Sequence, residues 1–154
     1  ARPCQGRGRE FESRFPLQIQ RKRRSYERRF FLRKKRRAMA GGSMKIICVP
    51  LSRGAMSRLD TDTCTDADLL DVQLDAEEFE AVWRSGLFTQ ANRALALNID
   101  EYEDERILGT VQLAAFSALV SACIEACPEV GALLKVEAQV RTALELDTGV
   151  YFFF

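Results

Sequence analysis

Histidine is absent from this chain of 154 residues. Without an imidazole there is no Ser-His-Asp triad, no Cys-His pair and no histidine metal ligand. The phosphate-binding pattern GxxxxGK is missing too, because Gly54 stands without a lysine at the required spacing. We therefore predict no catalytic site and no cofactor, and an enzyme that uses carboxylates or Cys48 is the last of three hypotheses.

Closely spaced cysteine pairs of the CxxC type are also absent. The five cysteines are odd in number and irregularly spaced, and they are Cys4, Cys48, Cys64, Cys123 and Cys127. Cys123 and Cys127 are one helical turn apart, but nothing else in the sequence supports a zinc site with four thiolates. We interpret the cysteines as small buried apolar residues of a protein in a reducing, cytoplasmic compartment.

A calcium loop is the second metal pattern that the sequence approaches without reaching. Four acids fall at loop positions one, three, seven and twelve: Asp60, Asp62, Asp66 and Asp71. Cys64 replaces an oxygen ligand and Thr65 replaces the glycine of the sharp turn, while a predicted strand follows in place of a helix. We predict no metal here and interpret the segment as a solvated acidic loop.

A long hydrophobic segment capable of crossing a membrane is not predicted. Residues 107–124 contain no charged side chain, and 18 positions approach the length of a transmembrane helix. Glycine, glutamine, serine and threonine interrupt the run, and many of its other positions are alanine. We predict a core helix surrounded by other elements.

Charge is abundant, and its two signs lie in different parts of the chain. Residues 1–43 carry 15 Lys and Arg against three acids, a net charge of +12. Residues 44–154 carry 8 basic residues against 19 acids, a net charge of −11. The sequence therefore divides into a basic extension, residues 1–43, and an acidic domain, residues 44–154.

The basic extension has two dense clusters within residues 17–40, and aromatic residues lie between them. The clusters are Arg21, Lys22, Arg23 and Arg24, and then Arg33, Lys34, Lys35, Arg36 and Arg37. This pattern is typical of an arm that binds nucleic acid, which is our alternative function, and it equally suits an anionic membrane surface. The other interpretation is a disordered tail or non-native upstream sequence, with Met44 as the true start.

Periodicity within residues 44–154 predicts a small α+β domain. Residues 45–51 and 69–74 have strand patterns, and the apolar end, residues 150–154, is expected to pair beside the Met44 strand. Helices are expected from Asp75, where Glu78 completes a capping box, and over residues 87–97, 107–124 and 130–144. We predict a sheet of two or three strands packed against about four helices, with the basic extension outside the core.

The densest acidic cluster comprises Asp100, Glu101, Tyr102, Glu103, Asp104 and Glu105. As an interaction surface, such a cluster would be relieved of its self-repulsion by a cationic partner and would steer that partner's association. As a purely structural feature, it would be the solvated start of the following helix, where carboxylates favour the positive end of the helix dipole. Both interpretations stay open from the sequence.

Two separated stretches resemble small acidic bacterial proteins of immunity type. They run from Leu74-Asp-Ala-Glu-Glu-Phe through Trp83 to Ile107, within residues 74–107, and over the closing residues 149–154. The resemblance implies a cytosolic protein that binds and neutralises a toxin domain, often a cationic nuclease, by presenting acids where the nucleic acid would lie. The expected partner is a protein with a basic surface.

Overall fold

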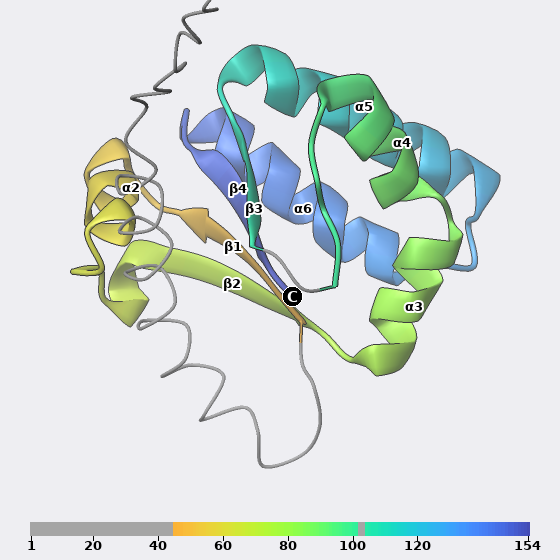
Figure 1. Cartoon of the computed structure of the whole chain (residues 1–154), viewed down its shortest axis with the longest axis horizontal. Coiled ribbons are helices and arrows are strands. Elements are labelled where there is room, and N and C mark those ends of the chain that lie inside the picture. The colour runs from red at the N-terminus through yellow and green to blue at the C-terminus, as the bar shows by residue number, and fades with distance from the viewer. Residues whose placement is uncertain (1–44, 102–103) are drawn as a thin grey trace, which may run out of the picture.

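The computed structural model describes residues 45–101 and 104–154. Within them, four strands form one antiparallel sheet in the order β2-β1-β4-β3 (Figure 1). The strands are β1 (Lys45–Pro50), β2 (Leu69–Leu74), β3 (Glu105–Leu108) and β4 (Gly149–Phe153). The predicted pairing of the C-terminal strand beside the first strand is confirmed, since Ile47 lies opposite Phe152.

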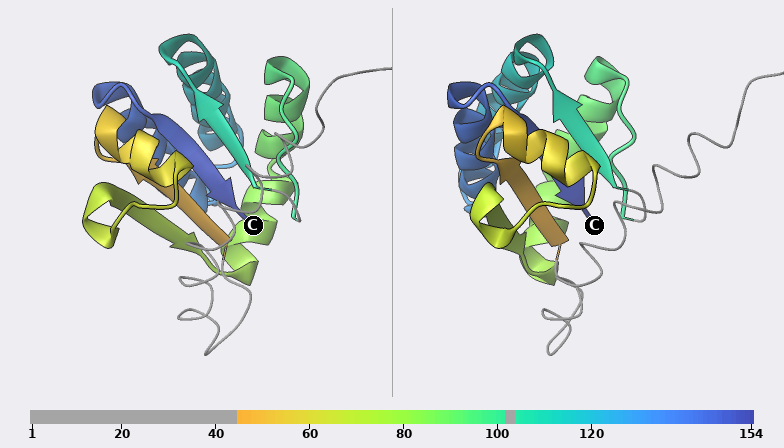
Figure 2. Two further views of the ribbon diagram at one scale, coloured as in Figure 1. Left: turned by 60° about the vertical axis from the view of Figure 1, so that its left-hand side comes forward. Right: turned by 90° about the vertical axis from the view of Figure 1, so that its left-hand side faces the viewer.

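Helices cover the two faces of this sheet very unequally (Figure 2). One face packs against α3 (Ala76–Arg84), α4 (Leu87–Leu95), α5 (Thr110–Ala126) and α6 (Ala132–Glu145). Phe116 and Phe88 both contact the ring of Phe152 edge-on at centroid distances of 5.9 Å. These aromatic contacts join helices and sheet in the larger group of buried residues, which we name the main core.

Of the described elements, α2 (Arg53–Asp60) and a short 3-10 helix (Asp66–Asp68) alone lie on the opposite face. Here a second group of buried residues, which we name the small core, comprises Ile46, Cys48, Leu59, Cys64, Leu69, Tyr151 and Phe153. The rings of Tyr151 and Phe153, both on β4, stack on each other with their centroids 6.3 Å apart. Alternation along β1 and β4 therefore buries both faces of the central strands.

Local sequence explains the start and the end of α3, as predicted. The Asp75 carboxylate accepts a hydrogen bond from the Glu78 amide at 2.8 Å, and the Glu78 carboxylate accepts one from the Asp75 amide at 3.2 Å. This capping box satisfies two amides that would otherwise lack partners. Gly86, at φ 80, then takes the left-handed conformation between α3 and α4, which glycine adopts without strain.

The α+β class is confirmed, but the predicted count of two or three strands is wrong. The missed strand is β3, and residues 107–108, assigned to the start of a helix, belong to it. The acidic cluster therefore precedes a strand, which excludes its interpretation as the first turn of a helix. The described residues also contain five α-helices rather than about four, because α2 forms between the first two strands, where no helix was predicted.

Candidate functional site

The acidic segment, residues 100–105, connects α4 to β3. Asp100, Glu101, Asp104 and Glu105 are within the described residues, whereas Tyr102 and Glu103 lie outside them. Glu101 and Asp104 are exposed, and Asp100 and Glu105 are half-buried. Four of the six predicted contact residues can therefore be placed, and two of those four are exposed at the surface.

The first end of the acidic segment is fixed by reciprocal hydrogen bonds between Asn92 and Ile99. The Asn92 side chain donates to the Ile99 carbonyl at 2.8 Å and accepts from the Ile99 amide at 2.8 Å. Ile99 itself is 1% exposed and belongs to the main core. The backbone that enters the acidic segment is thus held both by polar contacts and by apolar burial.

The second end is fixed by Glu105, which begins β3 opposite Phe152. Its carboxylate accepts a hydrogen bond from the Asn98 amide at 3.0 Å and one from the Arg106 amide at 2.9 Å. These bonds close the base of the connection between residues 98 and 105. Glu105, predicted to contact a partner, therefore uses its charge at least partly to hold the segment together.

Lys45 makes a third contact that holds the acidic segment, and the sequence did not predict it. Its ammonium group donates to the Glu101 carbonyl at 3.1 Å and lies 5.0 Å from the centre of the Phe79 ring. This places a positive charge against the backbone of the acidic segment without covering the exposed carboxylate of Glu101. The amine also lies over the Phe154 ring at 6.0 Å, in cation-π geometry.

A second acidic region, residues 60–71, differs because arginines form ion pairs with two of its carboxylates. Arg58 pairs with Asp68, and Arg106 donates to Asp60 at 2.9 Å. The Asp68 carboxylate also accepts from the amide and the hydroxyl of Thr65, at 2.8 and 3.1 Å. The Arg58 hydrogen bond, followed by the Thr65 amide, holds the pKa of Asp68 well below its usual range.

The cysteines divide between the two cores, so they do not form a four-thiolate site. Cys48 and Cys64 belong to the small core, whereas Cys123 is buried in the main core and Cys127 packs against it. Burial raises the pKa of the Cys123 thiol, which favours the inert protonated form. Within residues 45–101 and 104–154, no group of three or more acids and cysteines is arranged to hold a metal ion.

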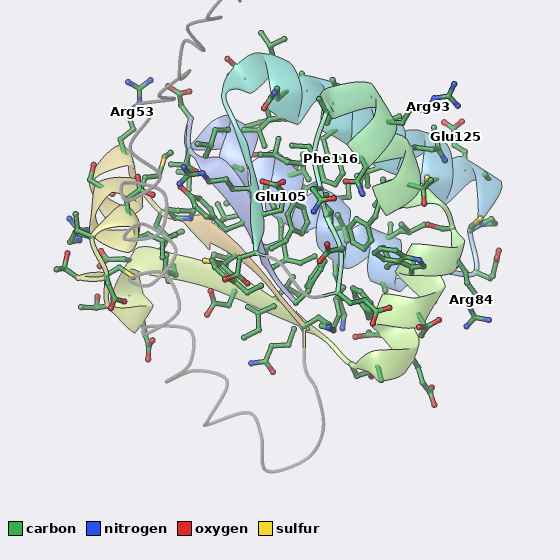
Figure 3. All side chains as sticks on the ribbon, viewed as in Figure 1. Arg53, Arg84, Arg93, Glu105, Phe116 and Glu125 are labelled. Atoms are coloured by element: carbon green, nitrogen blue, oxygen red, sulfur yellow. The ribbon has the colours of Figure 1, made fainter. Side chains whose placement is uncertain are left out.

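The charged side chains labelled in Figure 3 come from different parts of the fold. Glu105 lies on β3 at the edge of the sheet, whereas Arg84, Arg93 and Glu125 project from the helical layer. The basic clusters at residues 21–24 and 33–37 lie outside the described residues, so nucleic-acid binding through residues 17–40 remains a prediction.

Comparisons with protein-family models, with curated proteins and with solved structures give no match for this chain. The resemblance to immunity-type proteins therefore remains a prediction. No helix in the part of the chain that the structure describes combines the length and the apolarity needed to cross a membrane.

Proposed function

We propose that this chain is a small acidic protein-binding module, in which the acidic segment receives a basic surface of another protein. The observation that carries the proposal is that hydrogen bonds from Asn92 and Glu105 hold the chain at residues 98, 99 and 105, on either side of the exposed Glu101 and Asp104. Residues that are already held lose little conformational freedom when a partner binds, so more of the electrostatic attraction remains as affinity.

The contrast with residues 60–71 supports the choice of the acidic segment over the other acidic region. Asp60 and Asp68 each face an arginine of the same chain. In the acidic segment, Lys45 bonds the Glu101 carbonyl rather than its carboxylate. Glu101 therefore keeps its charge available for a cationic group of a partner.

An inhibitor or immunity role is the specific form of binding that we propose. Covering a basic surface blocks the contacts that such a surface makes with phosphates, and it does so without any chemistry of its own. This agrees with a chain that has no histidine and, in the described part, no metal-binding cluster. The expected partner is a cationic toxin domain, and a cytoplasmic location belongs to the same proposal.

Charge reversal at Glu101 and Asp104 tests the proposal. We expect the double variant E101K/D104K to bind fluorescent deca-lysine about tenfold more weakly than the parent at low salt, since exposed charge contacts contribute up to about 1 kcal/mol each. Fluorescence anisotropy measures the change. The difference should shrink at high salt, where screening weakens every exposed contact.

The matched control is E125K/E129K, which makes the same change in net charge at two exposed glutamates near the end of α5. If binding depends on the acidic segment, this control keeps most of its affinity. Equal losses in the two double variants would mean that only net charge matters, and the proposed site would be wrong.

A further inference from the structure

Residues 52–68, which contain α2 and the short 3-10 helix, form a strap over the small core. Only Ala55 and Leu59 are buried in α2, and Cys64 is 6% exposed in the connection that follows. The small core has seven buried residues against 22 in the main core. Lifting the strap would therefore expose much less apolar surface than global unfolding does.

Two ion pairs near the surface tie the strap to the rest of the domain. Arg53 pairs with Asp147, and these side chains are 77% and 52% exposed. Asp60 pairs with Arg106 of β3, at side-chain exposures of 43% and 32%. Exposed pairs contribute little free energy and weaken as salt rises.

Buried oxygen atoms in the strap and beneath it also favour opening. One Asp62 carboxylate oxygen is buried and makes no hydrogen bond within the described structure, and the Tyr151 hydroxyl is buried near Asp60 and Arg106 without a hydrogen bond of good geometry. Tyr151 as a whole is 4% exposed, so its hydroxyl has lost most contact with water. Opening returns both oxygen atoms to water and removes the cost of leaving them without hydrogen bonds.

We propose that the strap opens as a unit while the main core stays folded, and that it thereby controls access to the thiols of Cys48 and Cys64. Local opening of this kind is expected where a segment has little buried area and few strong contacts. Cys48 is 0% exposed on β1, directly in the small core, and Cys64 lies within the strap itself. Both thiols become sites for soft electrophiles only in the open form.

Iodoacetamide labelling of the full chain tests the proposal, with the extent of alkylation at each cysteine read by mass spectrometry. The thiolate sulfur displaces iodide, forms a carbon-sulfur bond and leaves its proton with water. Below the global unfolding transition in urea, we expect Cys48 and Cys64 to react at similar rates with weak urea dependence. Cys123, buried in the main core, should react only through global unfolding.

Loss of one ion pair that holds the strap should accelerate the labelling of Cys48 and Cys64 only. In Arg106→Gln, we expect labelling of Cys48 and Cys64 to rise about two- to fivefold with Cys123 unchanged, the range given by one exposed ion pair. Arg84→Gln, at an exposed position on α3, is the control and should change nothing. Raising the salt concentration should accelerate the same two thiols in the unmodified chain.

Two results would overturn the proposal in the unmodified chain itself. Equal urea dependence for Cys48, Cys64 and Cys123 would mean that the strap opens only when the whole domain unfolds. Rapid labelling of Cys64 with Cys48 as slow as Cys123 would mean that the connection frays without lifting α2. Neither result depends on whether a variant folds.

Discussion

At the residue scale, the Asn92 side chain bonds both the amide and the carbonyl of Ile99. A single amide thus replaces two backbone hydrogen bonds at a point where the chain has left a helix and has not yet entered a strand. An amide is suited to this position because it combines a donor and an acceptor at its tip.

Asn92→Ala should destabilise the domain by about 2 kcal/mol, because it leaves the amide and carbonyl of the buried Ile99 without these partners. Asn92→Asp is the informative control. It keeps an acceptor for the Ile99 amide but lacks a donor for the Ile99 carbonyl, so an intermediate loss is expected. Urea unfolding followed by circular dichroism measures both, and an unchanged midpoint for Asn92→Ala would contradict this role.

Tyr151 gives a prediction about alkaline pH. Burial raises the pKa of Tyr151 to about 12 in the folded chain, above its ordinary value of about 10. Between these two values the unfolded chain releases the phenol proton while the folded chain keeps it, so stability falls as pH rises through this range. Below about pH 10 both states are protonated, and the group has no effect on the pH dependence.

Tyr151→Phe should remove that part of the alkaline loss. At pH 8 the variant is expected to be as stable as the parent or up to about 1 kcal/mol more stable, since the deleted hydroxyl lies near Arg106 but makes no hydrogen bond of good geometry in the described structure. Urea unfolding at pH 8 and pH 11 measures the difference between the two chains. Parallel loss of stability in parent and variant would refute the assignment.

At the element scale, β3 and β4 approach each other unusually closely at Gly149. A Cβ atom on Gly149 would lie 2.9 Å from the Ile107 carbonyl oxygen and would also overlap the Leu108 side chain. Any side chain there would separate the edge strand from β4. Because β3 carries Glu105, this contact also sets the position of the acidic segment.

Gly149→Ala should therefore cost about 1–3 kcal/mol, the usual range for overpacking a filled interior. Gly131→Ala is the matched control, since nothing lies within 4 Å of its added Cβ and its φ of −57° suits alanine. The control should be neutral or slightly stabilising. Thermal unfolding of both variants checks the prediction, and equal melting temperatures would contradict it.

Elements with a complete local pattern were predictable from the sequence, and those that depend on distant pairing were not. The bounds of β2 followed from alternation, and the start of α3 from the Asp75 and Glu78 capping box. In contrast, β3 has only four residues. It is a strand because it pairs with β4, which is far along the chain. The helix α2 buries only Ala55 and Leu59, too few for an apolar stripe in the sequence.

The sequence predicted which acidic residues form the candidate site, but not the contacts that hold them in place. Its acids are adjacent in the sequence, so their density was visible directly. Asn92 is seven residues from Ile99, and Lys45 is 56 residues from Glu101. No periodic pattern marks contacts at such separations, and the structural use of Glu105 was hidden for the same reason.

At the scale of the whole molecule, two acidic regions have different uses. In residues 60–71, Asp68 pairs with Arg58 inside the strap, and Asp60 pairs with Arg106 of β3, which ties the strap to the sheet. The acidic segment takes no part in these two ion pairs. Its Glu101 and Asp104 are exposed, and the chain that leads into it is held at Ile99. Under the proposed function, we expect the net charge of −11 on residues 44–154 to attract a basic protein from a distance and the acidic segment to determine where it docks.

The most direct test of this account is amide chemical-shift mapping by nuclear magnetic resonance, with the isotope-labelled full chain titrated with deca-lysine at low salt. The account predicts the largest shifts at residues 98–106, with small shifts over the end of α5 and over residues 60–71. Shifts spread evenly over all acidic residues, or concentrated in residues 60–71, would contradict a binding site in the acidic segment.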